Sequence, residues 1–168
     1  EASLASNLPV ATALSERFDA AFIGLHVVVP PFIPGAWEGG ASVYVGPELI
    51  EAQRKAAQAL RERVESRFRK HGAARGQWQE RIGDPAVLLA EAAHTVDLVV
   101  AAKGGTDSAG AMAIAEHLVL AAGVPVLVVP SEASTAMGQS VLVGWNSSRE
   151  ATRAVHQALP FLVAAREV

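Results

Sequence analysis

The chain has 168 residues, 51% of them apolar, and this length allows a single domain with a full hydrophobic core. It contains no cysteine, which excludes disulfides and thiolate metal sites and fits a reducing compartment, so we expect a cytoplasmic protein. The net charge of -3, with both signs interspersed, provides no basic field for nucleic acid or for an anionic membrane surface. The longest uncharged apolar run, residues 118–130, is too short to span a bilayer and contains glycine and proline.

The first half of the chain alternates helical and strand patterns. Apolar residues at helical spacing predict a helix over residues 1–18, and an apolar run predicts a strand over residues 20–29. Residues 30–46, rich in proline and glycine, form the expected long loop. Pro47 opens the longest predicted helix, which Gly72 ends, and residues 77–82 read as a short strand.

The second half contains the clearest unit of the chain. Asp84 followed by Pro85 predicts a helix start, because the carboxylate caps free amide groups and proline presets the first turn. A valine-rich strand over residues 97–102, a glycine-containing loop, an alanine-rich helix stopped by Gly123 and a second valine-rich strand over residues 124–129 follow. This order predicts parallel strands that are buried on both faces and joined by crossover helices.

The C-terminal part reads as the start of a second repeat. Residues 131–139 form a polar linker, and residues 140–145 predict a strand. Ser147 with Glu150 three residues later forms a capping box that opens a last helix. Glu-Ala-x-x-Ala at residues 150–154 repeats the same pattern at residues 1–5. We therefore divide the chain into a domain over residues 1–130, a linker, and the strand and helix of a second copy over residues 140–168; the first copy is expected to lack its leading strand.

These segments resemble the universal stress protein family. The resemblance is carried by Gly24-Leu-His-Val-Val, by Gly83-Asp84-Pro85 before Val96-Asp97-Leu-Val-Val, by Gly123-Val-Pro-Val-Leu-Val-Val-Pro130, and by Val141-Leu-Val-Gly-Trp-Asn-Ser-Ser-Arg-Glu-Ala. It implies an α/β fold of the adenine-nucleotide alpha-hydrolase-like type: a three-layer open parallel sheet of about five strands with helices on both faces, often as tandem domains. The displaced strand over residues 140–145 would then complete the first sheet, within one chain or by exchange between chains.

The resemblance also implies a place for a nucleotide at the carboxyl ends of the strands. Part of the family binds ATP through glycine-rich turns whose amides point at phosphates. The family's loop contains Gly-x-x-Gly. In this chain the loop is degenerate, because Gly105 can stand for the first glycine but Ser108 stands in place of the second. The candidate cleft comprises Val28, Ala102, Lys103, Gly104, Gly105, Gly110, Asn146, Ser147 and Ser148. A plain connection with a surface lysine is the favoured reading of the loop, because isolated glycines are a weak signal. Helix capping explains Ser147, and Asn146 suits a turn as well as a purine.

The function that we expect is a stress-response protein that acts by dimerisation and by binding a partner or small ligand. The resemblance implies that the last strand, with Val124, Val126 and Val128, pairs with its counterpart in another domain. The alternative is an ATP-binding switch, with slow hydrolysis or self-phosphorylation; a flavin or redox module is a more distant one. No nucleophile is grouped with a base, so an enzyme has little support, and the five histidines share no metal-ligand spacing.

Overall fold

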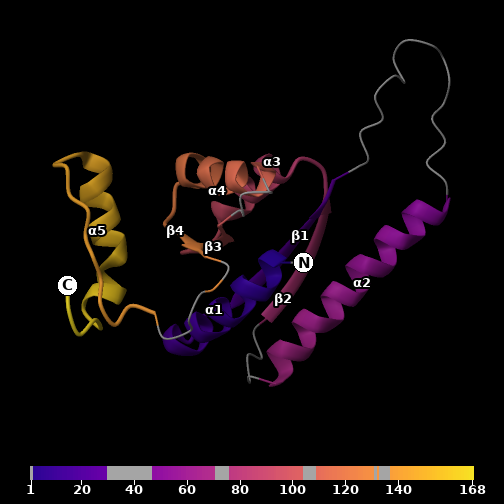
Figure 1. Cartoon of the computed structure of the whole chain (residues 1–168), viewed down its shortest axis with the longest axis horizontal. Helices are drawn as coiled ribbons and strands as arrows, with labels where there is room; N and C mark the ends of the chain where they lie inside the picture. The colour runs from indigo at the N-terminus through magenta and orange to yellow at the C-terminus, as the bar shows by residue number, and fades with distance from the viewer. Residues whose placement is uncertain (1, 30–46, 71–75, 104–108, 131, 133–136) are drawn as a thin grey trace, which may run out of the picture. The chain divides into compact units, whose positions relative to one another are not determined.

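The computed structural model describes residues 2–29, 47–70, 76–103, 109–130, 132 and 137–168. These residues form two units, residues 14–88 and residues 1–13 together with 89–168, and each unit is described by itself. The chain contains five helices and four short strands in these parts, in an order that alternates helix and strand from α1 to α5 (Figure 1).

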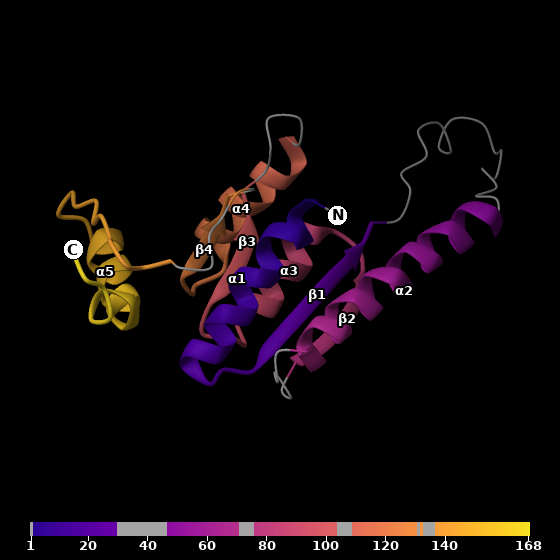
Figure 2. The same cartoon turned by 60° about the horizontal axis from the view of Figure 1, so that its bottom comes forward.

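Residues 14–88 are built around one strand, crossover helix, strand unit. Strand β1 (Phe22–Val28) pairs in parallel with β2 (Gly76–Ile82), from Phe22 opposite Gly76 to Val28 opposite Ile82. The connecting helix α2 (Pro47–Lys70) packs against β2, and it runs beside the strand pair in both views (Figures 1 and 2). Its buried stripe is Ala57, half-buried Leu60 and Val64, because residues three or four apart share one helix face.

The strand pair is held closely together at Gly24. A Cβ atom at this position would lie 3.0 Å from the ring of Trp78, its partner in the ladder, and 3.8 Å from Val64 of α2. The Trp78 ring also stacks on His26, with ring centroids 5.9 Å apart and an interplanar angle of 18°. Glycine therefore allows an aromatic ring to lie across the neighbouring strand beneath the helix.

The helix that follows β2 begins as the sequence predicts. Helix α3 (Pro85–Ala93) starts directly after Asp84, whose Oδ1 accepts hydrogen bonds from the Ala86 amide at 2.8 Å and from the Val87 amide at 3.4 Å. Pro85 occupies the first helical position, where the missing N–H costs nothing. The backbone before it is fixed by the Gly83 N–H, which donates to the Val28 carbonyl at 3.1 Å.

The other unit contains a second parallel pair. Strand β3 (Val99–Ala102) pairs with β4 (Val126–Val129), and helix α4 (Ala109–Ala121) connects them and contacts both. The buried residues of this connection are Ala115, Leu118 and Ala122. Gly123 follows at φ 68°, the left-handed conformation that glycine adopts most easily, and it turns the chain toward β4.

Helix α1 (Ala2–Phe18) precedes β1 and contains Pro9. Its Leu8, Val10 and Ala11 are buried, and the Thr12 hydroxyl donates to the Leu8 carbonyl at 2.7 Å. This bond satisfies the hydroxyl of a side chain that has almost no contact with solvent.

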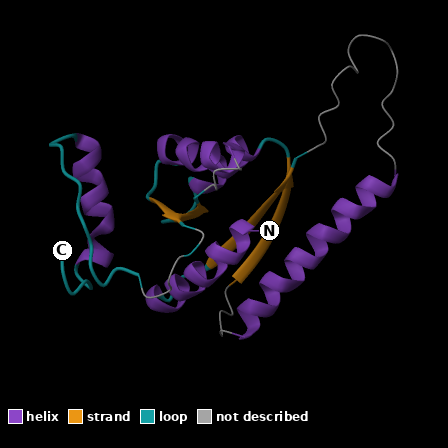
Figure 3. Cartoon of the chain, in the orientation of Figure 1, coloured by secondary structure: helices purple, strands orange, loops and turns teal. Residues whose placement is uncertain are grey.

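The C-terminal segment forms a small arrangement of its own. Ser140, which precedes helix α5 (Arg149–Leu162) in the chain, makes an isolated parallel bridge with Glu167, which follows it. The expected strand over residues 140–145 is wrong beyond that bridge, because the structure gives it no ladder (Figure 3). A strand needs a paired neighbour along its length, and only the first residues of this segment have one.

The architecture is thus α/β with parallel strands, as the alternation predicts. Within the described residues the strands form two two-stranded sheets, β1-β2 and β3-β4, and a single sheet of about five strands is not observed. The expected loop over residues 30–46 and the helix end at Gly72 lie outside the described residues.

Candidate functional site

The candidate site begins at the carboxyl end of β3. The β3-β4 ladder extends one step beyond Ala102, since the Lys103 N–H donates to the Val129 carbonyl at 2.7 Å. The Lys103 side chain is exposed at this point. Two parallel strands therefore end together beside an exposed ammonium group, which is where ligands bind in open parallel sheets.

The loop after Lys103 is only partly described. Gly104 and Gly105 lie outside the described residues, and the chain is described again from Ala109, where α4 begins. Gly110 is the second residue of that helix rather than part of a loop. The apolar pattern of the sequence begins only at Ala111, so it places the helix start two residues late.

The turn before α5 contains the three polar residues predicted for the site. The Asn146 Oδ1 accepts a hydrogen bond from the Ser148 N–H at 3.1 Å, and the Ser148 Oγ accepts one from the Ala151 N–H at 3.1 Å. Ser147 lies between them at φ 62°. The predicted cap at Ser147 is wrong: the helix N-cap is Ser148, because the left-handed backbone at Ser147 places the next residue at the helix start.

The side-chain oxygens of this turn are already used in hydrogen bonds within the chain. Both Asn146 Oδ1 and Ser148 Oγ are already acceptors for backbone N–H groups, so their present role is to begin a helix. A signal for this was in the sequence: Asn two residues before Ser favours an Asx turn, which moves the cap one residue beyond the Ser-x-x-Glu pattern.

Val28 belongs to the other unit. Its carbonyl accepts from Gly83 at the carboxyl end of β1, and its side chain is half-buried. The residues predicted for the cleft are thus found at strand ends and at a helix start, and the structure brings Ala102 and Lys103 together with the end of β4.

Two of the three residues predicted for an interface, Val126 and Val128, lie in β4, whereas Val124 precedes it, because the strand begins two residues later than the sequence predicts. Val124 and Val126 are half-buried, and Val128 is 37% exposed. The ladder described for β4 is the one with β3. No charged residue lies between Gly123 and Pro130.

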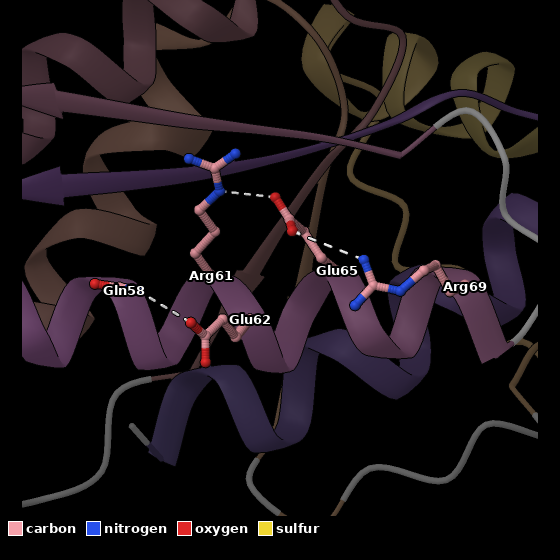
Figure 4. Close-up of polar contacts among 5 residues, drawn as sticks. All are labelled: Gln58, Arg61, Glu62, Glu65 and Arg69. Atoms are coloured by element: carbon pink, nitrogen blue, oxygen red, sulfur yellow. Dashed lines mark hydrogen bonds and ion pairs between the residues drawn. The ribbon is translucent and has the colours of Figure 1, made fainter.

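Helix α2 has the other well-defined polar arrangement. The Arg61 Nε donates to the Glu65 Oε1 at 2.7 Å, Arg69 lies 3.9 Å from the Glu65 Oε2, and the Gln58 amide donates to Glu62 at 3.1 Å (Figure 4). The hydrogen bond to Glu65, together with its negative charge, raises the pKa of the Arg61 guanidinium. These are exposed contacts one helical turn apart, so they stabilise the surface of the helix and do not form a reactive site.

Trp145 corrects a further expectation. Trp78 and Trp145 both stand in runs that the sequence predicts as strands, and this position favours a place in the core, whereas Trp145 is 57% exposed. Its neighbours in the chain lack the ladder that would bury it.

Among the residues that the structure describes, no group of three His, Asp or Glu side chains is arranged to hold a metal ion. No helix in these parts of the chain has the length and apolar character needed to cross a membrane. Comparisons with protein-family models, with curated proteins and with solved structures return no match.

Proposed function

We propose that the chain is a universal-stress-type α/β domain that acts by association, and that two copies join through the open edge of β4. The proposal extends the family resemblance of the sequence. It is supported by the order of elements, in which two parallel strand pairs each enclose a crossover helix.

The observation that carries the proposal is the chemistry of the β4 edge. Residues 124–129 have no charge, and Pro125 precedes the paired residues, so the ladder itself contains no proline. Natural edge strands that remain single are protected by charged residues, bulges or proline. An unprotected edge with a partly exposed Val128 is suited to pair with the same edge of a second copy.

The experiment is the molar mass of the Val128→Glu variant by light scattering. We expect a dimer for the parent chain and a monomer for the variant, because the substitution would place one carboxylate from each copy in an apolar contact. Val119→Glu on α4 is the matched control, since Val119 is also exposed and belongs to the same unit. A dimer that survives Val128→Glu as well as Val119→Glu would refute this interface.

Nucleotide binding is the second candidate, favoured by one observation: the exposed Lys103 lies where β3 and β4 end together. An ammonium group there is a counter-charge for phosphate. Titration calorimetry with ATP and Mg²⁺ tests it, with Lys103→Ala expected to weaken binding and Lys55→Ala, exposed on α2, expected to leave it unchanged. Absence of heat with the parent chain would remove this candidate and leave the association proposal standing.

A further inference from the structure

The two asparagines of the chain stand in different local surroundings. Asn7 lies inside helix α1 and is followed by the bulky side chain of Leu8. Asn146 lies in the turn before helix α5 and is followed by Ser147. Asparagine is chemically labile, because the backbone nitrogen of the next residue can attack its side-chain carbonyl carbon. A small residue outside a helix permits this attack, and a bulky helical residue hinders it.

The Asx turn folds the Asn146 side chain over the nitrogen that would attack it. The Asn146 Oδ1 accepts a hydrogen bond from the Ser148 N–H at 3.1 Å. This bond closes a small ring that contains both the Asn146 Cγ and the Ser147 nitrogen. Because the ring limits the motion of the two reacting groups, it lowers the entropy cost of bringing them together.

The other atoms of the reaction are free to take part in it. In the part of the chain that the structure describes, the Ser147 N–H and the Asn146 Nδ2 make no hydrogen bond. Helix α5 begins only at Arg149, and Ser147 has a left-handed backbone at φ 62°, so the Ser147 N–H is not held in the helix. The Ser148 N–H, in contrast, donates to the oxygen on which negative charge develops during the attack.

We propose that Asn146 is a site of spontaneous deamidation, with water as the only co-reactant. The Ser147 nitrogen loses its proton and bonds to the Asn146 Cγ, the Cγ–Nδ2 bond breaks, and the nitrogen leaves as ammonia with that proton. The product is a cyclic succinimide. Water then adds to one of its carbonyl carbons and opens the ring, which leaves aspartate or isoaspartate at this position. No group is oxidised or reduced.

The two products affect the start of helix α5 in opposite ways. Aspartate keeps the Asx turn and adds a negative charge, which the Ser148 N–H and the helix dipole stabilise. Isoaspartate places its Cβ in the main chain, so the turn that sets Ser148 at the N-cap is lost. The whole site lies within residues 146–148, so the reaction depends neither on pairing at β4 nor on a bound nucleotide.

The test is incubation of the purified chain in mildly alkaline buffer, followed by digestion and mass spectrometry. Trypsin places Asn146 in the peptide of residues 104–149 and Asn7 in the peptide of residues 1–17. We expect the first peptide to gain the mass of a carboxylic acid in place of an amide, and an isoaspartate-specific methyltransferase to label part of it. The second peptide should stay unchanged over the same time, because helical backbone holds the Leu8 nitrogen.

A variant tests the attacking nitrogen, and unfolding tests the turn. Ser147→Val adds a β-branched side chain that shields the nitrogen and disfavours the left-handed backbone, so conversion at Asn146 should become several-fold slower. Circular dichroism checks that this variant folds. The parent chain unfolded in urea lacks the Asx turn, so it should react more slowly at Asn146 than the folded chain does.

Three results would overturn the proposal. The first is conversion at Asn146 that is no faster than conversion at Asn7. The second is a folded chain that reacts more slowly than the unfolded chain, which would show that the turn protects Asn146. The third is a folded Ser147→Val variant that reacts as fast as the parent chain.

Discussion

Replacement of Gly24 by alanine is expected to destabilise the β1-β2 unit, although the same replacement in an open strand position stabilises. The new Cβ would lie 3.0 Å and 3.3 Å from two carbons of the Trp78 ring, against an optimum of about 3.5–4.0 Å. The ring cannot tilt away freely, because His26 is stacked on it. Overpacking of this kind costs about 1–3 kcal/mol.

The opposing term is the lower entropy of alanine in the unfolded chain, which contributes about 0.4–1 kcal/mol. The difference of the two ranges is a net loss of about 0–2.6 kcal/mol, centred at about 1.3 kcal/mol, or roughly 4 °C in Tm for a chain of this length. Thermal and urea unfolding followed by circular dichroism measure it. Gly144→Ala is the matched control, because nothing lies within 4 Å of its added Cβ.

A double variant separates the steric cause from a general one. Trp78→Leu removes the ring carbons that the new methyl group meets. In that background Gly24→Ala should lower the free energy of unfolding only a little, so the double variant should be more stable than the sum of the two single losses predicts. Gly24→Ala with the stability of Gly144→Ala, or with the same cost whether or not Trp78 is present, would refute the close-packing argument.

Two further substitutions test the core and the helix cap by urea unfolding. Leu118→Ala should lose about 2–5 kcal/mol, because the side chain is 2% exposed, whereas Leu120→Ala, at 87% exposed, should change stability by less than about 0.5 kcal/mol; equal losses would contradict the assigned face of α4. Ser148→Ala should lower the free energy of unfolding by about 1 kcal/mol, because the Ser148 Oγ caps the Ala151 N–H, while Ser147→Ala leaves that cap in place. A larger loss with Ser147→Ala than with Ser148→Ala would show that Ser147 is the cap, as the sequence predicts.

The sequence predicts the elements whose signals are local. Asp84 and Pro85 mark the start of α3 to the residue, because a carboxylate cap and a preset first turn act within one helical turn. Gly123 marks the end of α4 for the same reason, since its left-handed backbone is a local requirement. The four strands that have ladders are also found, with ends that differ by one or two residues.

The helix start at α5 shows where local signals compete. Ser147 and Glu150 match a capping box, yet the Asn146 side chain takes the Ser148 N–H, and the left-handed Ser147 moves the cap by one residue. Two turn motifs overlap within residues 146–150, and a prediction based on only one of them assigns the cap to the wrong serine. The candidate site at Lys103 was predicted from strand order and from the family resemblance; strand order indicates where strands end but not what binds there.

The contrast between residues 126–129 and residues 141–145 separates propensity from pairing. Both runs are rich in valine and leucine and carry no charge, so composition gives them the same strand prediction. Only the first run is a strand, because β3 supplies a ladder from Val99 to Ala102. The second run is paired only at its start, where Ser140 bridges Glu167 and the Val141 N–H donates to the Glu167 carbonyl, and its Leu142 is 97% exposed. Since a β-strand obtains most of its stability from its neighbour, equal propensity gives a strand in the first run and an unpaired segment in the second.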